Sequence, residues 1–244
     1  MNSPLAGKQI VVTRPVHQSG TMRQMLEVRG ATVVEFPTIR IEPASNPKPL
    51  QQALNELATF DRVLFTSVNG VTYTWQHLQH PWPDSVRVAA IGPATAAALN
   101  SRGVTPDFVP SEYVAEALAS GLGPVQDQSI LLLRASKARP TLVELLRAGG
   151  AKVTLVTAYE THVNHPPDAA YAALADGADA VTFTSGSTVE GFVAVSPDPK
   201  IPVTAACIGP ITAQVAADAG FKVAIVAKTY TTEGLVAALE EYFE

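Results

Sequence analysis

The residues best suited to chemistry in this sequence are hydroxyl and basic side chains that follow short apolar runs. The hydroxyl side chains in such positions are Ser67, Thr95, Ser185, Ser187 and Thr212. The basic side chains are Arg14, Arg134, Lys137 and Arg139. If each run is a strand that leads into a helix, the turn presents free backbone N–H groups and the positive end of the helix dipole. We therefore expect these turns to bind carboxylates, with the hydroxyl and basic side chains adding hydrogen bonds and charge.

Two of these turns contain nearly the same residues. Gly92 and Gly209 each precede a proline and lie three residues before a threonine, Thr95 or Thr212. Glycine allows a ligand to approach the backbone closely, and proline presets the first helical turn. The alternative is that the Ser and Thr hydroxyls only cap helices, at about 1 kcal/mol each, and that the arginines are solvated surface charge. Both interpretations stay open for this set of residues.

The matching turns belong to an internal duplication of the chain. Gly92 and Gly209 are 117 positions apart (209 minus 92), and the same offset relates Tyr113 to Tyr230 (230 minus 113). The matches at offsets of 118 and 120 are Phe65-Thr66-Ser67 with Phe183-Thr184-Ser185 and residues 13–31 with residues 133–151. We conclude that the chain contains two versions of one structural unit.

Short β-branched runs alternate with helical patterns along the chain, which predicts an α/β fold with parallel sheets. The middle of the chain contains five expected strands, at residues 62–66, 86–91, 108–109, 130–133 and 152–156. The N-terminal part contributes two further strands and the C-terminal part three, so the two ends should form a second five-stranded unit. The predicted fold is two flavodoxin-like, doubly wound parallel-sheet domains.

Two proline-bounded stretches mark the crossings between these domains. Residues 39–45 and 157–165 alternate like exposed strands, and prolines lie beside both. We expect them to be connecting strands that form a two-stranded linker ladder. Domain 1 is then discontinuous, with residues 1–38 and 166–244, and domain 2, residues 46–156, is inserted into it.

Composition and charge restrict the class of protein. The chain is 47% hydrophobic and 16% charged, as in ordinary globular proteins. A net charge of -5 argues against a nucleic-acid partner, which requires a basic face. The single cysteine, Cys207, excludes a disulfide framework and is expected to be buried and inert. Because we find no secretory leader and no apolar run near the roughly 20 residues that span a bilayer, we expect a cytoplasmic protein without a membrane partner.

Two further motifs do not support a site. The segment from Gly186 to Gly191 resembles the start of a P-loop, but the Lys and Ser/Thr that complete a P-loop are missing. The pairs His77/His80 and His162/His165 lack the flanking acidic or His ligands of a zinc site. We therefore expect no metal site.

Tyr159 breaks the duplication. At the offset of 120, it corresponds to Ile39 (159 minus 39), so the second crossing stretch carries a phenol where the first carries an aliphatic side chain. A phenol can donate and accept hydrogen bonds, whereas the isoleucine side chain can do neither. Tyr159 is therefore the residue that most clearly distinguishes the two copies.

A series of short motifs, in one order along nearly the whole chain, resembles the uroporphyrinogen-III synthase family. The motifs are Thr13-Arg14-Pro15, Phe65-Thr66-Ser67-Val68-Asn69, Ile91-Gly92-Pro93-Ala94-Thr95, Arg134 with Arg139, Gly149-Gly150-Ala151, Ala158-Tyr159-Glu160-Thr161, Thr184-Ser185-Gly186-Ser187 and Ile208-Gly209-Pro210-Ile211-Thr212. The resemblance implies two flavodoxin-like lobes and a lyase of haem (porphyrin) biosynthesis. Its reaction would close the linear tetrapyrrole hydroxymethylbilane into uroporphyrinogen III, with inversion of ring D, loss of water and no cofactor.

The resemblance also implies roles for individual residues. The substrate is a polycarboxylate, which suits the expected anion-binding turns and adds Asn69 to the residues that should contact it. Tyr159 corresponds to a family tyrosine that faces the cleft between the lobes. We hypothesise that its hydroxyl assists departure of the substrate's hydroxyl as water. Because a free phenol has a pKa of about 10, it is a poor acid and the effect should be modest. The alternative for Tyr159 is simple packing in the linker.

Two other classes of protein remain as alternatives to a monomeric enzyme. A non-catalytic bilobed binding protein for an anionic small molecule would share the two-domain layout, although such proteins are usually exported. A flavodoxin-like signalling or scaffold module would carry an acidic pocket at its strand ends, where this chain has Thr, Ser, Arg and Gly. The fold alone does not choose among these classes. Analysis of the reaction product discriminates between them.

Overall fold

The computed structural model describes residues 4–196 and 203–244, and the chain divides into two compact units. Unit 1 comprises Met1–Arg40 and His162–Glu244, and unit 2 comprises Ile41–Thr161. The chain therefore passes between the units inside the two stretches expected to be connecting strands. Residues 1–3 and 197–202 of the expected domain 1 lie outside the described residues.

The sheet of unit 1 is parallel and has the strand order β10-β9-β8-β1-β2. Its strands are β1 (Gln9–Val12), β2 (Thr32–Glu35), β8 (Ala180–Phe183), β9 (Thr204–Cys207) and β10 (Lys222–Val226). Its helices are α1 (Val16–Val28), α7 (Asp168–Ala175), α8 (Gly186–Val195), α9 (Pro210–Asp218) and α10 (Thr232–Phe243). Numbered along the unit, the strand order is the flavodoxin-like 2-1-3-4-5, which confirms the predicted fold class.

The sheet of unit 2 has the strand order β3-β7-β6-β4-β5. Its strands are β3 (Ile39–Pro43), β4 (Arg62–Phe65), β5 (Arg87–Ala90), β6 (Ser129–Ala135) and β7 (Lys152–Val163). Its helical segments are α2 (Lys48–Asn55), a short 3-10 turn (Leu57–Thr59), α3 (Val68–His77), α4 (Pro93–Asn100), α5 (Ala115–Gly121) and α6 (Thr141–Ala148). Strands β7, β6, β4 and β5 repeat the arrangement of β2, β1, β8 and β9, so the duplication extends to the topology.

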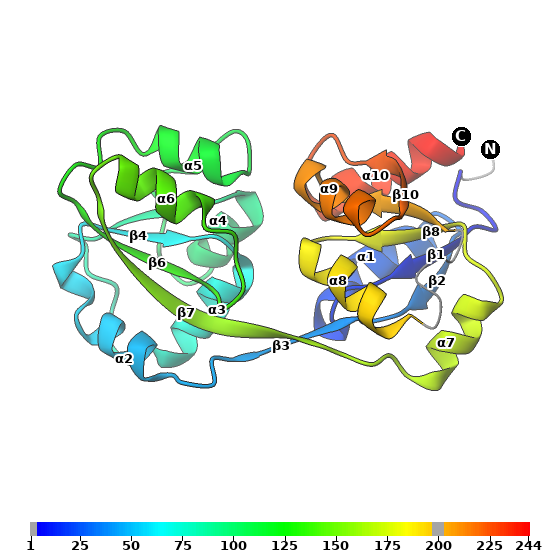
Figure 1. Cartoon of the computed structure of the whole chain (residues 1–244), viewed down its shortest axis with the longest axis horizontal. Helices are drawn as coiled ribbons and strands as arrows, with labels where there is room; N and C mark the ends of the chain where they lie inside the picture. The colour runs from blue at the N-terminus through cyan, green and yellow to red at the C-terminus, as the bar shows by residue number, and fades with distance from the viewer. Residues whose placement is uncertain (1–3, 197–202) are drawn as a thin grey trace. The chain divides into compact units, whose positions relative to one another are not determined.

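Two strand predictions for unit 2 are wrong in detail. The expected strand at residues 108–109 is only an isolated parallel bridge between Phe108 and Ala89, because prolines at 106 and 110 limit the ladder. The expected strand 152–156 and connecting stretch 157–165 are instead one continuous strand, β7, which ends at Val163. Strand β3 is the hydrogen-bonded neighbour of β7, as a two-stranded ladder requires (Figure 1).

Helices cover both faces of the sheet in each unit, as Figure 1 shows. In unit 1, Ile10 and Val12 of β1 pack with buried residues of α1 and α10, whereas Val11 packs with buried residues of α7, α8 and α9. This division follows from the alternation of side chains along a strand. In unit 2 the same two layers are formed by α5 and α6 and by α2, α3 and α4. Each sheet is therefore buried on both faces, and its carboxyl edge is left for binding.

The pairing registers allow the two units to be compared residue by residue. Strands β1 and β2 begin their pairing at Gln9 and Thr32, and β6 and β7 begin theirs at Ser129 and Lys152, which are the same positions plus 120. Helices α3 and α8 both contain 10 residues and start 118 positions apart (186 minus 68). The sequence offsets therefore identify structurally equivalent positions.

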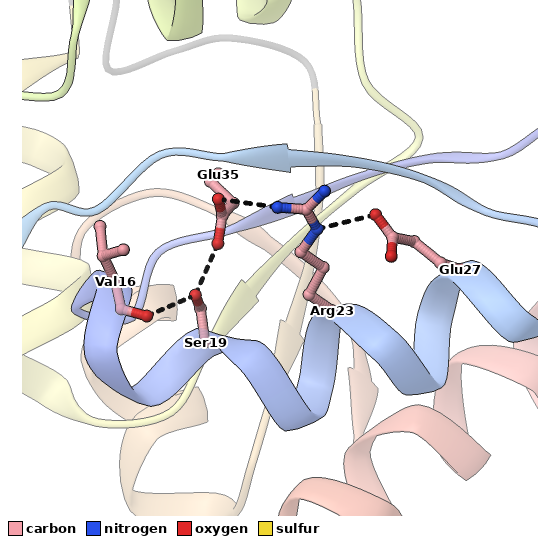
Figure 2. Close-up of polar contacts among 5 residues, drawn as sticks. All are labelled: Val16, Ser19, Arg23, Glu27 and Glu35. Carbon is pink, nitrogen blue, oxygen red and sulfur yellow. Dashed lines mark hydrogen bonds and ion pairs between the residues drawn. The ribbon is translucent and has the colours of Figure 1, made fainter.

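Polar side chains tie α1 to the neighbouring strand β2 in unit 1 (Figure 2). Ser19 Oγ lies 2.6 Å from a carboxylate oxygen of Glu35 and 2.9 Å from the carbonyl oxygen of Val16. Arg23 contacts Glu27 at 2.8 Å and the other oxygen of Glu35 at 3.3 Å. Such exposed ion pairs are screened by solvent and add little stability. Because Glu35 is the last residue of β2, its partners balance a negative charge at the carboxyl edge of the sheet.

Within the described residues, no helix combines the length and the apolar character that a membrane crossing requires.

Candidate active site

Most predicted site residues lie at or just after the carboxyl ends of parallel strands in both units, and Tyr159 lies within β7. Strands β1, β8 and β9 are neighbours in unit 1, and β6, β4 and β5 are neighbours in unit 2. The matching residues at the two edges are Arg14, Ser185 and Gly209 in unit 1 and Arg134, Ser67 and Gly92 in unit 2. Open α/β sheets bind their ligands outside this edge. Each unit therefore offers one candidate edge.

Arg14 is a partly buried cation at the edge of unit 1. It follows β1, and its Nη1 donates a hydrogen bond of 2.9 Å to Oγ1 of Thr232, in the first turn of α10. Burial lowers the pKa of the Arg14 guanidinium, and the negative charge of Glu233 acts in the opposite direction. Because the guanidinium of arginine is effectively always protonated in proteins, Arg14 stays charged. Its charge is therefore oriented within unit 1 by α10.

Ser185 is the N-cap residue of α8. Its hydroxyl accepts a hydrogen bond of 3.3 Å from the backbone N–H of Thr188, and the Thr188 hydroxyl accepts one of 3.3 Å from the backbone N–H of Ser185. This reciprocal capping box already satisfies two backbone donors. Ser187 is half-buried in the first turn of the same helix. Ser185 therefore caps α8, and contact with a ligand stays a prediction for both serines.

The two Gly-Pro turns begin α4 and α9, and neither helix has a side-chain cap. A Cβ atom on Gly92 would lie 3.1 Å from the Tyr113 ring, and one on Gly209 would lie 3.2 Å from the Tyr230 ring. The absence of a side chain therefore lets each turn pack against a tyrosine. The backbone N–H groups at both turns lack a capping side chain, which suits an anion.

Thr95 and Thr212 are nearly buried in the first turns of α4 and α9. They are 4% and 5% exposed, respectively. Most of each residue is therefore enclosed by its own unit, which is consistent with a packing role for both threonines. Contact of the Thr95 and Thr212 hydroxyls with a ligand stays a prediction.

Three basic residues lie in or beside the loop between β6 and α6 of unit 2. Arg134 is half-buried, and its Nη1 donates a hydrogen bond of 3.1 Å to the carbonyl oxygen of Arg139. Burial lowers the pKa of the Arg134 guanidinium, which nevertheless stays charged. Lys137 and Arg139 are exposed. The loop thus brings positive charge to the carboxyl edge of the sheet.

Tyr159 lies beside the first turn of α3 in unit 2. The pairing of β6 with β7 shifts at this point, since Arg134 pairs with Thr157 and Ala135 with Tyr159. Such an irregularity redirects a side chain relative to a regular strand. The Tyr159 hydroxyl lies 3.0 Å from Ser67 Oγ in a hydrogen bond in which either group can donate. The side chain is 8% exposed, so it is largely held by protein atoms.

Ser67 has two functions at this point. Its hydroxyl accepts a hydrogen bond of 2.9 Å from the backbone N–H of Gly70, which caps α3, and it also contacts Tyr159. Burial raises the pKa of the Tyr159 phenol above its ordinary value of 10.0, whereas hydrogen bonds with the side chains of Ser67 and Asn69 act to lower it. Tyr159 is therefore protonated at neutral pH and can donate a hydrogen bond.

Tyr73 was not predicted as a site residue, and its ring stacks on that of Tyr159. The ring centroids are 5.9 Å apart and the ring planes differ by 19°. A signal for this residue was present in the duplication, because Tyr73 corresponds to Gly191 at the offset of 118 (191 minus 73). An aromatic side chain in one copy thus stands where the other copy has no side chain.

The structure brings some predicted residues into direct contact and leaves others apart. Ser67, Asn69 and Tyr159 are joined by hydrogen bonds. The other predicted residues form the turns and the basic loop described above, within their own units. In the described parts of the chain, no group of three or more His, Cys, Asp or Glu side chains has an arrangement that could hold a metal ion.

Comparison with known proteins gives one consistent family. The model of the family described as uroporphyrinogen-III synthase HemD matches residues 20–237. The uroporphyrinogen-III synthase of Synechococcus elongatus is 34% identical and covers 98% of this chain and 97% of its own length. The porphyrin biosynthesis protein HemD of Ruminiclostridium josui is 32% identical over 99% of this chain and 50% of that protein.

A solved structure supports the fold. The crystal structure of a mutant uroporphyrinogen III synthase from the extremely thermophilic bacterium Thermus thermophilus matches with a TM-score of 0.68, over 97% of both chains and at 22% identity. The family match and the near-complete coverage of a relative at 34% identity lead to one conclusion. The chain belongs to the uroporphyrinogen-III synthase family.

Proposed function

We propose that this chain catalyses the reaction of its family, the closure of hydroxymethylbilane into uroporphyrinogen III within haem biosynthesis. The chain acts as a cyclising lyase, which removes water and inverts ring D. The match of the family over residues 20–237 is the observation that carries this proposal. The alternative of a non-catalytic binding protein for an anionic small molecule has no comparable support.

The carboxylates of the substrate are bound by turns at the carboxyl edges of the two sheets. The starts of α4 and α9 offer backbone N–H groups without a side-chain cap, and Arg14 offers an oriented charge. The basic loop that follows Arg134 adds further positive charge. Such local donors explain how a chain with a net charge of -5 can bind a polyanion. The KM should therefore rise with ionic strength.

The step proposed for Tyr159 is the departure of the substrate's hydroxyl group. The bond between carbon and this oxygen breaks, the pyrrole electrons stabilise the azafulvene cation that forms, and the oxygen leaves as water after gaining a proton from solvent. Tyr159 donates a hydrogen bond to the departing oxygen. Because burial raises the pKa of this phenol, complete proton transfer is disfavoured, and the hydrogen bond supplies most of the effect.

The later steps require positioning more than acid–base chemistry. The far ring attacks through its substituted carbon, which gives a spiro intermediate that fragments and recloses with ring D inverted. The protein must hold both ends of the chain so that this attack is faster than simple closure. Because many contacts share this task, single substitutions among the carboxylate-binding residues should have small effects.

Product analysis tests the proposed function. Freshly prepared hydroxymethylbilane is incubated with the protein, the products are oxidised, and the uroporphyrin isomers are separated. We expect the type III isomer in excess over the type I isomer that forms without enzyme. Type I alone, at the rate seen with heat-denatured protein, would contradict the proposal. A complex that binds substrate but yields only type I would instead favour the binding-protein alternative.

We also propose that the enzyme acts as a monomer in the cytoplasm. The single cysteine is a buried thiol that needs no oxidising compartment. Light scattering should give a mass close to 25.7 kDa. Cell fractionation should recover the activity with the cytoplasmic proteins.

A further inference from the structure

We propose that Tyr73 is a positioning residue that holds the Tyr159 ring in its working orientation. The effect of Tyr73 on the reaction rests on the proposed function, because it acts through Tyr159. Its effect on the geometry of Tyr159 does not depend on that function and can be measured in the free protein.

One helix contacts Tyr159 at three points. Ser67 is the N-cap of α3 and Asn69 lies in its first turn, and both side chains form hydrogen bonds with the Tyr159 phenol. Tyr73 lies four residues after Asn69, which places both on the same face of the helix. The polar residues thus hold the hydroxyl end of Tyr159, and Tyr73 holds its ring.

The stacked geometry restricts a motion that the hydrogen bonds leave free. Two hydrogen bonds to the hydroxyl fix the position of one atom, but the ring can still rotate about its long axis. A second ring at a centroid distance of 5.9 Å and an angle of 19° opposes that rotation. Tyr159 lies where the register of β7 shifts, so the backbone alone gives it less support than a regular strand would.

Tyr73 is itself anchored at its far end. Its hydroxyl donates a hydrogen bond of 3.1 Å to the carbonyl oxygen of Ile41, in β3. Burial and the nearby negative charge of Glu42 raise the pKa of the Tyr73 phenol, so the proton that this bond requires is retained at neutral pH. The ring of Tyr73 is therefore fixed by strand β3 as well as by its own helix.

The duplication supplies an internal comparison for this pair. The positions equivalent to Tyr159 and Tyr73 in unit 1 are Ile39 and Gly191. A Cβ atom on Gly191 would lie 2.8 Å from Ile39 Cγ2 and 2.6 Å from the carbonyl oxygen of Thr38. Helix α8 therefore packs directly on the chain at Thr38 and Ile39, whereas α3 carries an aromatic ring at the same place. Both positions of the pair therefore differ between the two units, as expected for residues that pack against each other.

Fluorine NMR of protein that contains 3-fluorotyrosine tests the geometry. The chain has six tyrosines, and the resonance of Tyr159 is the one that is lost in Tyr159→Phe. We expect Tyr73→Leu to shift this resonance and broaden it, because the neighbouring ring current and the restraint are both removed. Tyr73→Phe keeps the ring and should leave the resonance close to its original position. Val71→Ala, a buried change in the same helix, is the control for a general loss of packing.

A double-mutant cycle tests whether Tyr73 acts through Tyr159. We expect Tyr73→Leu to lower kcat by about three- to tenfold, with a smaller change in KM, and Tyr73→Phe to restore most of it. In the Tyr159→Phe background, Tyr73→Leu should have almost no further effect. Equal losses in both backgrounds would overturn the assignment.

The failures of the two proposals are distinguishable. If Tyr159→Phe turns over as fast as the original enzyme, the role of Tyr159 in the reaction is wrong. The fluorine resonance of Tyr159 in Tyr73→Leu then still tests whether Tyr73 positions the Tyr159 ring. A Tyr159 resonance that Tyr73→Leu leaves unmoved and sharp would overturn it, whatever the kinetics show.

Discussion

The carboxyl edges of the two sheets are formed by equivalent residues, yet one helix contact differs between the units. In unit 2, α3 contacts Tyr159 of β7, and in unit 1, α8 contacts Thr38 and Ile39. In unit 2, Ser67 caps α3 and also contacts the phenol of Tyr159. In unit 1, the equivalent Ser185 shares its capping hydrogen bonds with Thr188 and no phenol is present at the matching position, which is Ile39. The equivalent serines thus cap a helix in both units, and Ser67 of unit 2 also forms a hydrogen bond with a phenol.

The difference shows how the same fold accommodates a phenol in one unit and not in the other. In unit 1, the Thr38 hydroxyl lies 3.1 Å from the carbonyl oxygen of Thr188, and Gly191 leaves no room for a side chain. In unit 2, the helix and strand accommodate two stacked rings instead. The two units therefore differ at two packed positions, which lie 86 residues apart in unit 2 (159 minus 73). We interpret unit 1 as a binding unit and unit 2 as the unit that also acts on the leaving group.

The largest effect is expected when unit 1 is forced toward the bulkier arrangement of unit 2. Gly191→Ala places a Cβ atom 2.6 Å from the carbonyl oxygen of Thr38, so either helix α8 or the backbone at Thr38 must move. We expect the free energy of unfolding to fall by about 2 to 3 kcal/mol, as measured by urea denaturation.

The matched control is Gly20→Ala in α1, where a Cβ atom has no neighbour within 4 Å. That variant should gain about 0.5 to 1 kcal/mol. Equal behaviour of the two variants would show that the close packing is unimportant.

A second effect is a loss of stability at alkaline pH that is caused by Cys207 of unit 1. It should disappear when Cys207 is replaced by alanine, the residue at the equivalent position of unit 2. Burial raises the pKa of the Cys207 thiol from 9.0 to about 12. Below the lower value both folded and unfolded protein keep the proton. Above it only the unfolded state loses the proton, so stability falls as pH rises, by about 1.4 kcal/mol per pH unit until the folded pKa is reached.

Cys207→Ala, which copies the equivalent Ala90, removes this dependence. Urea denaturation of both proteins at about pH 8 and pH 10.5 should show an extra loss of about 2 kcal/mol in the original protein only. The same loss in both proteins would assign the alkaline instability to other groups.

A smaller effect should separate the two capping serines. Ser67→Ala and Ser185→Ala each remove an N-cap and should cost about 1 kcal/mol of stability. Only Ser67→Ala should also lower kcat, by about threefold, because Tyr159 loses a hydrogen-bond partner. Ser185→Ala should act mainly on KM. Steady-state kinetics of the two variants, compared at equal stability loss, provide the measurement. An equal fall of kcat in Ser67→Ala and Ser185→Ala would contradict the claim that only Ser67 acts through Tyr159.

Most of the fold was predictable because its signals are local. The alternation of apolar strands with amphipathic helices identified the parallel sheets, and the duplication matched the two halves of the chain. The extent of β7 was not predictable, because the register shift beside Tyr159 interrupts the alternation of side chains. The strand expected at Phe108 failed for another local reason, since flanking prolines remove ladder donors.

The candidate site was predictable only in part. The turns that follow the strands could be located from the sequence, because turn residues and strand ends are visible in it. The contact between Ser67 and Tyr159 and the stack of Tyr73 on Tyr159 depend on how α3 packs beside β7, which is a long-range property. Burial of the phenol, and hence the direction of its pKa shift, also follows from packing that no local pattern reveals.

The most direct measurement of the central claim is the turnover of Tyr159→Phe with freshly prepared hydroxymethylbilane, with the uroporphyrin isomers separated after oxidation. This variant keeps the ring stack and removes only the hydroxyl group. We expect kcat to fall by about tenfold, the worth of one hydrogen bond to the departing oxygen, while KM stays nearly constant and the product stays mainly type III. Undiminished turnover to type III would show that the phenol of unit 2 takes no part in the loss of water.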